Sequence, residues 1–84
     1  MADIELWACG AIQAIDPSFS NLDEQQRLTE NLFTSGRLDS LGLMNFLLDA
    51  EAAFNFSFTA EAFQDRRLQT IKGLAEVISE LRRS

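Results

Sequence analysis

The hydrophobic pattern near the start of the chain predicts an amphipathic helix over residues 3–15. Apolar residues recur there three and four positions apart, which places them on one face of a helix. They are Ile4, Ala8, Ala11, Ile12 and Ile15, with Trp7 beside them. The pattern ends at Asp16-Pro17, because a residue before proline disfavours helical backbone. The chain therefore begins with one helix of about three turns.

The next segment, residues 18–38, is polar and rich in Ser, Asn and Asp, which predicts a loop. One helical turn is expected near Asp23 to Leu28. Loops of this length in small proteins are usually either functional or disordered. Apolar side chains that recur through the segment favour an ordered loop anchored to the core, and these are Phe19, Leu22, Leu28, Leu32 and Phe33.

Three further helical segments follow. Asp39 and Ser40 are good capping residues, and they precede a helix predicted from about Leu41 to Phe54. Residues 55–58 alternate polar and aromatic side chains, but a single strand would have no partner, so a turn is expected. Thr59 is expected to cap a short helix and Thr70 a last one. The apolar face of the last helix consists of Ile71, Leu74, Ala75, Ile78 and Leu81.

These elements predict an all-α fold. It has three main helices and one short helix, packed as a four-helix bundle with a long loop between the first two helices. A chain of 84 residues has room for one modest core, so residues 1–84 are expected to form a single domain.

The helix predicted over residues 41–54 has two apolar stripes. Burial in the bundle accounts for the first, which consists of Leu43, Phe46, Leu47, Ala50 and Phe54. The second consists of Leu41, Met44 and Leu48 and lies roughly 130° further round the helix. Polar residues edge this second stripe, namely Asn45, Asp49 and Glu51. An apolar centre with a polar rim is typical of a docking surface, whereas the alternative is that the long loop covers the stripe. Helix geometry leaves both interpretations open.

Charge narrows the class of partner. The formal net charge is −6, and residues 1–65 hold eleven acidic residues against Arg27 and Arg37. Such a surface repels the phosphates of nucleic acids and attracts basic patches on proteins. No stretch approaches the roughly 18 apolar residues that span a bilayer, and the start lacks a basic region followed by an apolar run. We therefore expect a cytoplasmic protein with protein partners, no nucleic acid and no membrane insertion.

Few catalytic side chains are available. Cys9 is the one cysteine and histidine is absent, which excludes an intrachain disulfide, a Cys/His zinc site and every mechanism that uses histidine. An enzyme would have to activate Ser40 with Lys72 or a carboxylate. We predict no enzymatic activity and no metal site.

Residues 32–54, LFTSGRLDSLGLMNFLLDAEAAF, resemble the attachment region of acyl and peptidyl carrier proteins. The match centres on Asp39-Ser40-Leu41. The resemblance implies that Ser40 receives 4'-phosphopantetheine covalently from coenzyme A, in a reaction that a separate phosphopantetheinyl transferase performs. Asp39 then corresponds to the aspartate that helps to hold magnesium during this modification. A phosphodiester is electrostatically favoured at such a place, because a helix N-terminus carries free N–H groups and the positive end of the helix dipole.

The resemblance also implies partners. A free-standing monomeric carrier holds acyl or aminoacyl intermediates as thioesters and presents them to a loading ligase and to downstream acyl-processing enzymes, as in fatty acid or secondary metabolite biosynthesis. Leu41, Met44 and Leu48 match the apolar recognition positions of the family, and Asn45, Asp49 and Glu51 form the rim in our interpretation.

The chain departs from fatty-acid carriers in ways that favour a dedicated pathway. Gly42 and Asn45 stand where acidic or polar residues are common, and Thr59 stands where proline is frequent. The segment Glu61 to Gln69 is longer than in those carriers. These features are similar to D-alanyl carrier proteins and stand-alone aminoacyl carriers. The alternative function is an unmodified helical adaptor that binds a partner through residues 41–54, with Asp39-Ser40 acting only as a cap.

Overall fold

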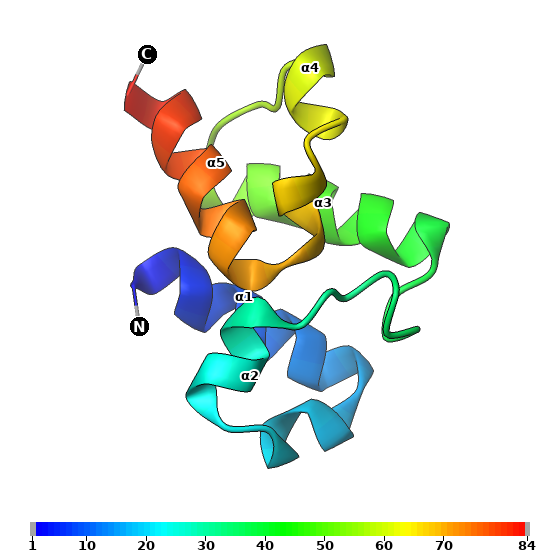
Figure 1. Cartoon of the computed structure of the whole chain (residues 1–84). Helices are drawn as coiled ribbons and strands as arrows, with labels where there is room; N and C mark the ends of the chain where they lie inside the picture. Colours follow the sequence, from blue (N-terminus) through cyan, green and yellow to red (C-terminus); the bar gives the residue numbers. More distant parts are fainter. Residues whose placement is uncertain (1, 84) are drawn as a thin grey trace.

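The computed structural model describes residues 2–83 and shows an all-α fold (Figure 1). Three helices are long, as predicted, and no described residue lies in a strand. The elements in order, with η for a 3₁₀-helix, are α1 (Asp3–Ile15), η1 (Pro17–Asn21), α2 (Glu24–Thr29), α3 (Ser40–Phe54), α4 (Ala60–Phe63), η2 (Arg66–Gln69) and α5 (Ile71–Arg83). Among these described elements, no helix is long and apolar enough to cross a bilayer.

Local side-chain caps set the helix ends. The Asp23 carboxylate accepts the Gln26 amide at 2.8 Å, and the Gln26 side chain accepts the Asp23 amide at 3.1 Å, which forms a capping box at α2. The Thr59 hydroxyl accepts the amide of Ala62 at 3.1 Å and begins α4. The Thr70 hydroxyl accepts the Gly73 amide at 3.0 Å at the start of α5. The predicted caps at Thr59 and Thr70 are therefore confirmed.

The segment predicted as a loop contains more regular structure than the sequence indicated. Besides the expected helical turn, now α2, it begins with η1, which Asp16 caps by accepting the Ser18 amide at 3.1 Å. Pro17 occupies the first position of η1, where its missing N–H costs no hydrogen bond. The proline that ends α1 therefore also begins the next element.

Phe33, an expected loop anchor, and Ile15, from the apolar face of the first helix, are both exposed instead of packed in the core. Phe33 is 39% exposed, because the Asn31 side chain accepts the amides of Phe33 and Thr34 at 3.0 and 2.8 Å and turns the chain outward. Ile15 is 57% exposed, because it is the last residue of α1 and the backbone turns away at Asp16. The other predicted loop anchors do contact the core, either buried (Phe19 and Leu32) or partly buried (Leu22 and Leu28).

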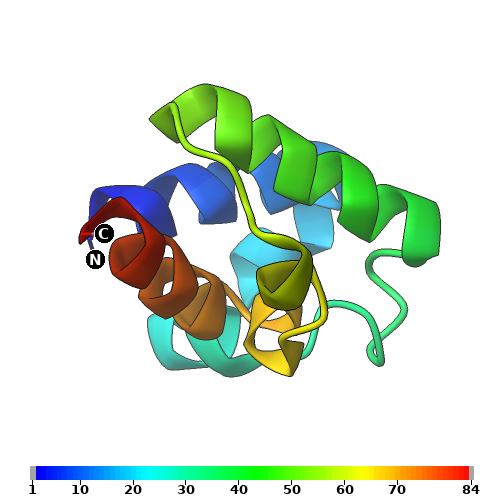
Figure 2. The same ribbon diagram turned by 90° about the horizontal axis from the view of Figure 1, so that it is seen from above.

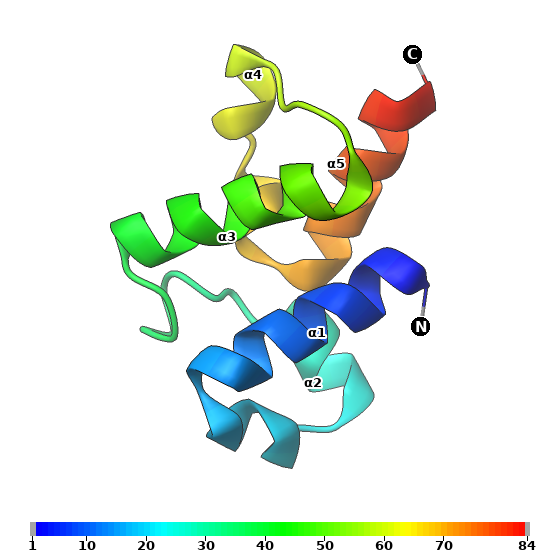
Figure 3. The same cartoon turned by 180° about the vertical axis from the view of Figure 1, so that it is seen from behind.

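The core lies between α1, α3 and α5. Trp7 of α1 stacks on Phe46 of α3 with ring centroids 5.5 Å apart and meets Phe54 edge-on at 5.6 Å. Such aromatic pairs add about 0.5–1.5 kcal/mol each beyond their buried area. The view from behind shows α3 lying across the molecule, with α1 below it (Figure 3).

This packing leaves the N-terminal end of α3 at the edge of the molecule. Figure 2 shows both ends of the chain on one side and the start of α3 on the other. The segment that connects α2 to α3 approaches this end along the molecular surface (Figure 1).

Candidate functional site

Asp39 is the N-cap of α3. Its backbone is extended, its Oδ1 accepts the Gly42 amide at 2.6 Å, and its carbonyl accepts the Leu43 amide at 2.8 Å. Gly42 leaves space for this cap, since a Cβ there would lie 3.1 Å from the same Oδ1. The other carboxylate oxygen of Asp39 takes part in no hydrogen bond or ion pair with another described residue. Asp39 therefore caps the helix and still has one acceptor oxygen to offer.

Ser40 is the first residue of α3 and is exposed to solvent. Asp39 accepts the Gly42 and Leu43 amides, which leaves the amides of Ser40 and Leu41 without an acceptor in the helix, and the positive end of the helix dipole lies there. A phosphodiester on the Ser40 oxygen would meet these groups. The site thus has the donor set that a covalently attached phosphate requires.

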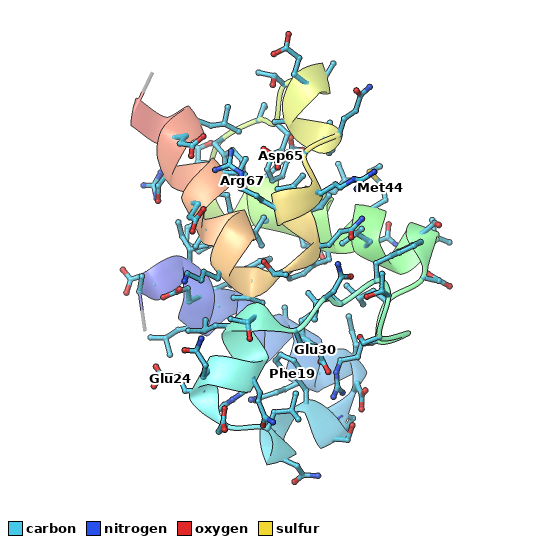
Figure 4. The ribbon with its side chains drawn as sticks, in the orientation of Figure 1. Phe19, Glu24, Glu30, Met44, Asp65 and Arg67 are labelled. Carbon is cyan, nitrogen blue, oxygen red and sulfur yellow. The ribbon has the colours of Figure 1, made fainter. Side chains whose placement is uncertain are left out.

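The second apolar stripe of α3 is exposed. The exposed fractions are 69% for Leu41, 44% for Met44 and 47% for Leu48, and Figure 4 marks Met44 on this helix. The interpretation that the long loop covers these side chains is therefore wrong. The first stripe is buried at Phe46, Leu47 and Ala50 and partly buried at Leu43 and Phe54, as predicted.

The three polar residues beside the stripe differ in their surroundings. Asn45 and Asp49 are exposed, whereas Glu51 is only partly exposed. The Glu51 carboxylate accepts the Phe58 amide at 2.7 Å, and its carbonyl accepts the Phe56 amide at 3.2 Å. Glu51 therefore holds the turn after α3, and Asn45 and Asp49 are the rim residues with free access to a partner.

The backbone before Ser40 is held at two buried leucines. The Leu32 amide donates to the carbonyl of Gln69 at 2.7 Å, and the Leu38 amide donates to the Leu32 carbonyl at 3.0 Å. Between them the chain turns outward through Gly36, whose φ of 83° suits a residue without a side chain. The segment just before the cap is thus tied to η2 through Gln69.

Arg37, which the sequence analysis did not single out, joins this segment to the first half of the chain. Its Nη1 lies 2.7 Å from Asp16 Oδ2 and 3.2 Å from the Ser18 hydroxyl, and its Nε bonds to Glu30 Oε2. The Ser18 hydroxyl and amide, together with Arg37, hold the pKa of Asp16 below its ordinary value. The bond with Glu30 raises the pKa of Arg37 above its ordinary value. The sequence did offer one indication of this role, since Arg37 is one of only two basic residues among the acidic residues 1–65.

A second arginine cluster lies at the other end of the molecule. Arg67 bonds to Asp65 at 2.9 Å and Glu80 at 2.7 Å, with Glu76 at 3.7 Å, and thereby joins η2 to α5. Its hydrogen bonds to Asp65 lower the pKa of that carboxyl. Figure 4 shows Arg67 and Asp65 in the upper half of the view, and Phe19 and Glu30 in the lower half.

The other side chains that could react or bind a metal lie away from Ser40. Cys9 is buried in α1, and burial raises the pKa of its thiol, as expected for a packing residue. Within residues 2–83, no group of three or more acidic, cysteine or histidine side chains is placed to hold a metal ion.

Comparison with known families gives one match. The model of a family described as phosphopantetheine attachment site matches residues 17–78, from η1 into α5. No curated protein and no solved structure matched the chain.

Proposed function

The chain belongs to the phosphopantetheine attachment-site family, and from that premise we propose that Ser40 is the attachment residue of an acyl or aminoacyl carrier. Membership implies a covalently attached 4'-phosphopantetheine and the role of a carrier that works with a phosphopantetheinyl transferase and with acyl-processing enzymes. The observation that supports Ser40 is its place as the exposed first residue of α3, within the matched region. When attached, the arm supplies a terminal thiol on which the cargo is held as a thioester.

The proposed modification is a phosphoryl transfer to the Ser40 oxygen. The Oγ forms a bond to the pantetheine-linked phosphorus of coenzyme A, adenosine 3',5'-bisphosphate leaves, and a base of the transferase takes the hydroxyl proton. The first turn of α3 stabilises the resulting anionic diester through its free N–H groups. The test is the intact mass of the chain after incubation with coenzyme A, magnesium and a broad-specificity transferase. A gain of one phosphopantetheine is expected, and no gain in a folded sample contradicts the proposal.

We expect Asp39 to act in the modification as well as in capping. Asparagine at position 39 still accepts the Gly42 amide but lacks the charge that binds magnesium, so Asp39→Asn separates the two roles. The free energy of unfolding should change by less than about 0.5 kcal/mol. The kcat/KM of the transferase for this variant should fall roughly tenfold, as for the loss of one carboxylate near a metal.

Asp39→Ala is the matched variant, because it removes the charge and the cap together. It should cost about 1 kcal/mol of stability and be modified as slowly as Asp39→Asn. If Asp39→Asn is modified at the rate of the original chain, Asp39 is a cap only.

The exposed stripe of α3 is the proposed docking surface, formed by Leu41, Met44 and Leu48, with Asn45, Asp49 and Glu51 beside it. Replacing Leu48 by Gln should raise the KM of the transferase for the carrier about fivefold, since apolar side chains at an interface centre contribute most to affinity. Stability should change by less than about 0.5 kcal/mol, because Leu48 is already 47% exposed.

Leu6→Gln is the control for this surface. Leu6 is 57% exposed on α1 and lies outside the stripe. Its substitution should leave KM unchanged. Equal effects of the two substitutions would show that general surface hydrophobicity, and not the α3 stripe, governs docking.

The proposed cargo belongs to a dedicated acyl or aminoacyl pathway in the cytoplasm, with the carrier acting as a monomer. Support comes from α3, where Gly42 and Asn45 replace acidic or polar residues and where Glu51 is committed to the turn that follows. Support also comes from the segment 61–69, which folds as the end of α4 and η2. The mass of the loaded protein isolated from its own cells would identify the cargo.

A further inference from the structure

One side chain connects the approach to Ser40 with the ends of two other helices. Arg37 stands three residues before Ser40 and binds Asp16, which follows the last residue of α1. It also binds Glu30, which follows the last residue of α2. One guanidinium therefore links the end of α1, the end of α2 and the segment before α3.

The surroundings of Arg37 distinguish it from an ordinary surface ion pair. Its side chain is only 15% exposed, and its guanidinium carbon lies 5.1 Å from the ring centroid of the fully buried Phe19. Figure 4 places Phe19 and Glu30 together at this part of the molecule. The planar guanidinium bonds to two carboxylates in fixed directions, whereas exposed pairs hold their partners loosely. Arg37 is thus a restraint on the backbone that carries it.

Outside a local turn at residues 31–36, that backbone has few other restraints. Residues 33–36 are all exposed, and only the buried Leu38 separates Arg37 from the cap residue Asp39. Residues 33–36 bond only within a local turn that begins at Asn31. Between that turn and the cap, the segment is held by the Arg37 ion cluster and by Leu38, whose side chain is buried and whose amide donates to the Leu32 carbonyl at 3.0 Å. Without Arg37, the attachments left between the local turn and the cap would be those of Leu38.

We infer that Arg37 is a positioning residue for the modification of Ser40, an inference that rests on the proposed function. The transferase must bind Ser40 and Asp39 in one geometry. If the preceding segment is already held in place, binding requires little further ordering, whereas a mobile segment must be ordered at each encounter. Loss of Arg37 should then raise KM and leave kcat nearly unchanged, because the bound carrier regains the same geometry.

The experiment compares Arg37→Gln with Arg67→Gln in the transferase assay on the full chain. Arg67 is the matched control, since it also binds several acidic residues but joins η2 to α5 in the opposite half of the molecule. For Arg37→Gln we expect KM for the carrier to rise about tenfold with kcat within twofold. For Arg67→Gln both constants should stay within twofold. Arg37→Lys should raise KM less than Arg37→Gln does, because lysine keeps the positive charge but lacks the planar guanidinium that bonds to two carboxylates.

The outcomes separate this inference from the proposed function. An original chain that gains no phosphopantetheine overturns both. An original chain that is modified, together with an unchanged KM for folded Arg37→Gln or an equal rise for Arg67→Gln, overturns the positioning role alone. If Arg37→Gln does not fold, Glu30→Gln decides in the same assay, since it weakens the cluster and leaves Arg37 in place. A threefold rise in KM supports the role, and an unchanged KM overturns it.

Discussion

Ser40→Ala is expected to abolish the gain of phosphopantetheine while the protein remains folded. The substitution removes the only oxygen that the proposed attachment uses. Asp39, not Ser40, provides the cap of α3, so the helix keeps its first hydrogen bond at 2.6 Å. The free energy of unfolding should therefore change by less than about 0.5 kcal/mol. Intact mass after incubation with coenzyme A and the transferase, with denaturant unfolding of both proteins, measures the two quantities.

Ser57→Ala is the control, because Ser57 is also exposed but lies in the connection after α3. It should gain the arm as the original chain does. A gain by Ser40→Ala would place the attachment at another residue. A folded original chain without any gain would leave the helical adaptor as the better account of the exposed α3 stripe.

Gly73→Ala is expected to cause the largest loss of stability, about 2–3 kcal/mol. A Cβ at this buried position would lie 2.2 Å from the carbonyl oxygen of Arg67, so η2 and α5 would have to separate. The same carbonyl accepts the Thr70 amide at 3.2 Å and is part of the turn that begins α5. Alanine favours a helix over glycine by about 1 kcal/mol, which is too little to offset this clash. Urea unfolding of the variant measures the difference.

Gly10→Ala is the control for Gly73→Ala, because it makes the same substitution in a helix without the close contact. Gly10 lies on the exposed side of α1, and an added Cβ there meets no atom within 4 Å. This variant should be more stable than the original chain by roughly 0.5–1 kcal/mol. If the two alanine variants are equally stable, the close approach of η2 to α5 is not a constraint on the fold.

Short-range signals account for the elements that were predicted correctly. The Asp16-Pro17 stop and the Thr59 and Thr70 caps involve residues at most three positions apart, and such interactions can be recognised in a sequence. The same holds for the start of α3, where Asp39 and Ser40 are neighbours. That Ser40 carries the arm stays a prediction for the mass measurement.

Long-range contacts decided what the pattern left open. Periodicity predicted two stripes on α3, but whether residues 18–38 cover the second one depends on where that segment packs. The Leu32 amide holds the segment against η2 by donating to the Gln69 carbonyl, 37 positions away in the sequence. The second stripe stays exposed at Leu41, Met44 and Leu48. Phe33 was also wrongly expected in the core, but there the cause is local, because a turn at Asn31 directs its side chain outward.

The sequence by itself determined the three long helices, the caps at Asp39, Thr59 and Thr70, the excess of acidic residues and the candidate serine, because each depends on residues close together in the chain or on composition alone. It did not reveal η1 or η2. Only the tertiary structure decided that the α3 stripe is exposed, that Arg37 joins Asp16 to Glu30 and that Gly73 lies against Arg67. These features depend on which distant residues meet, and hydrophobic periodicity carries no information on that choice.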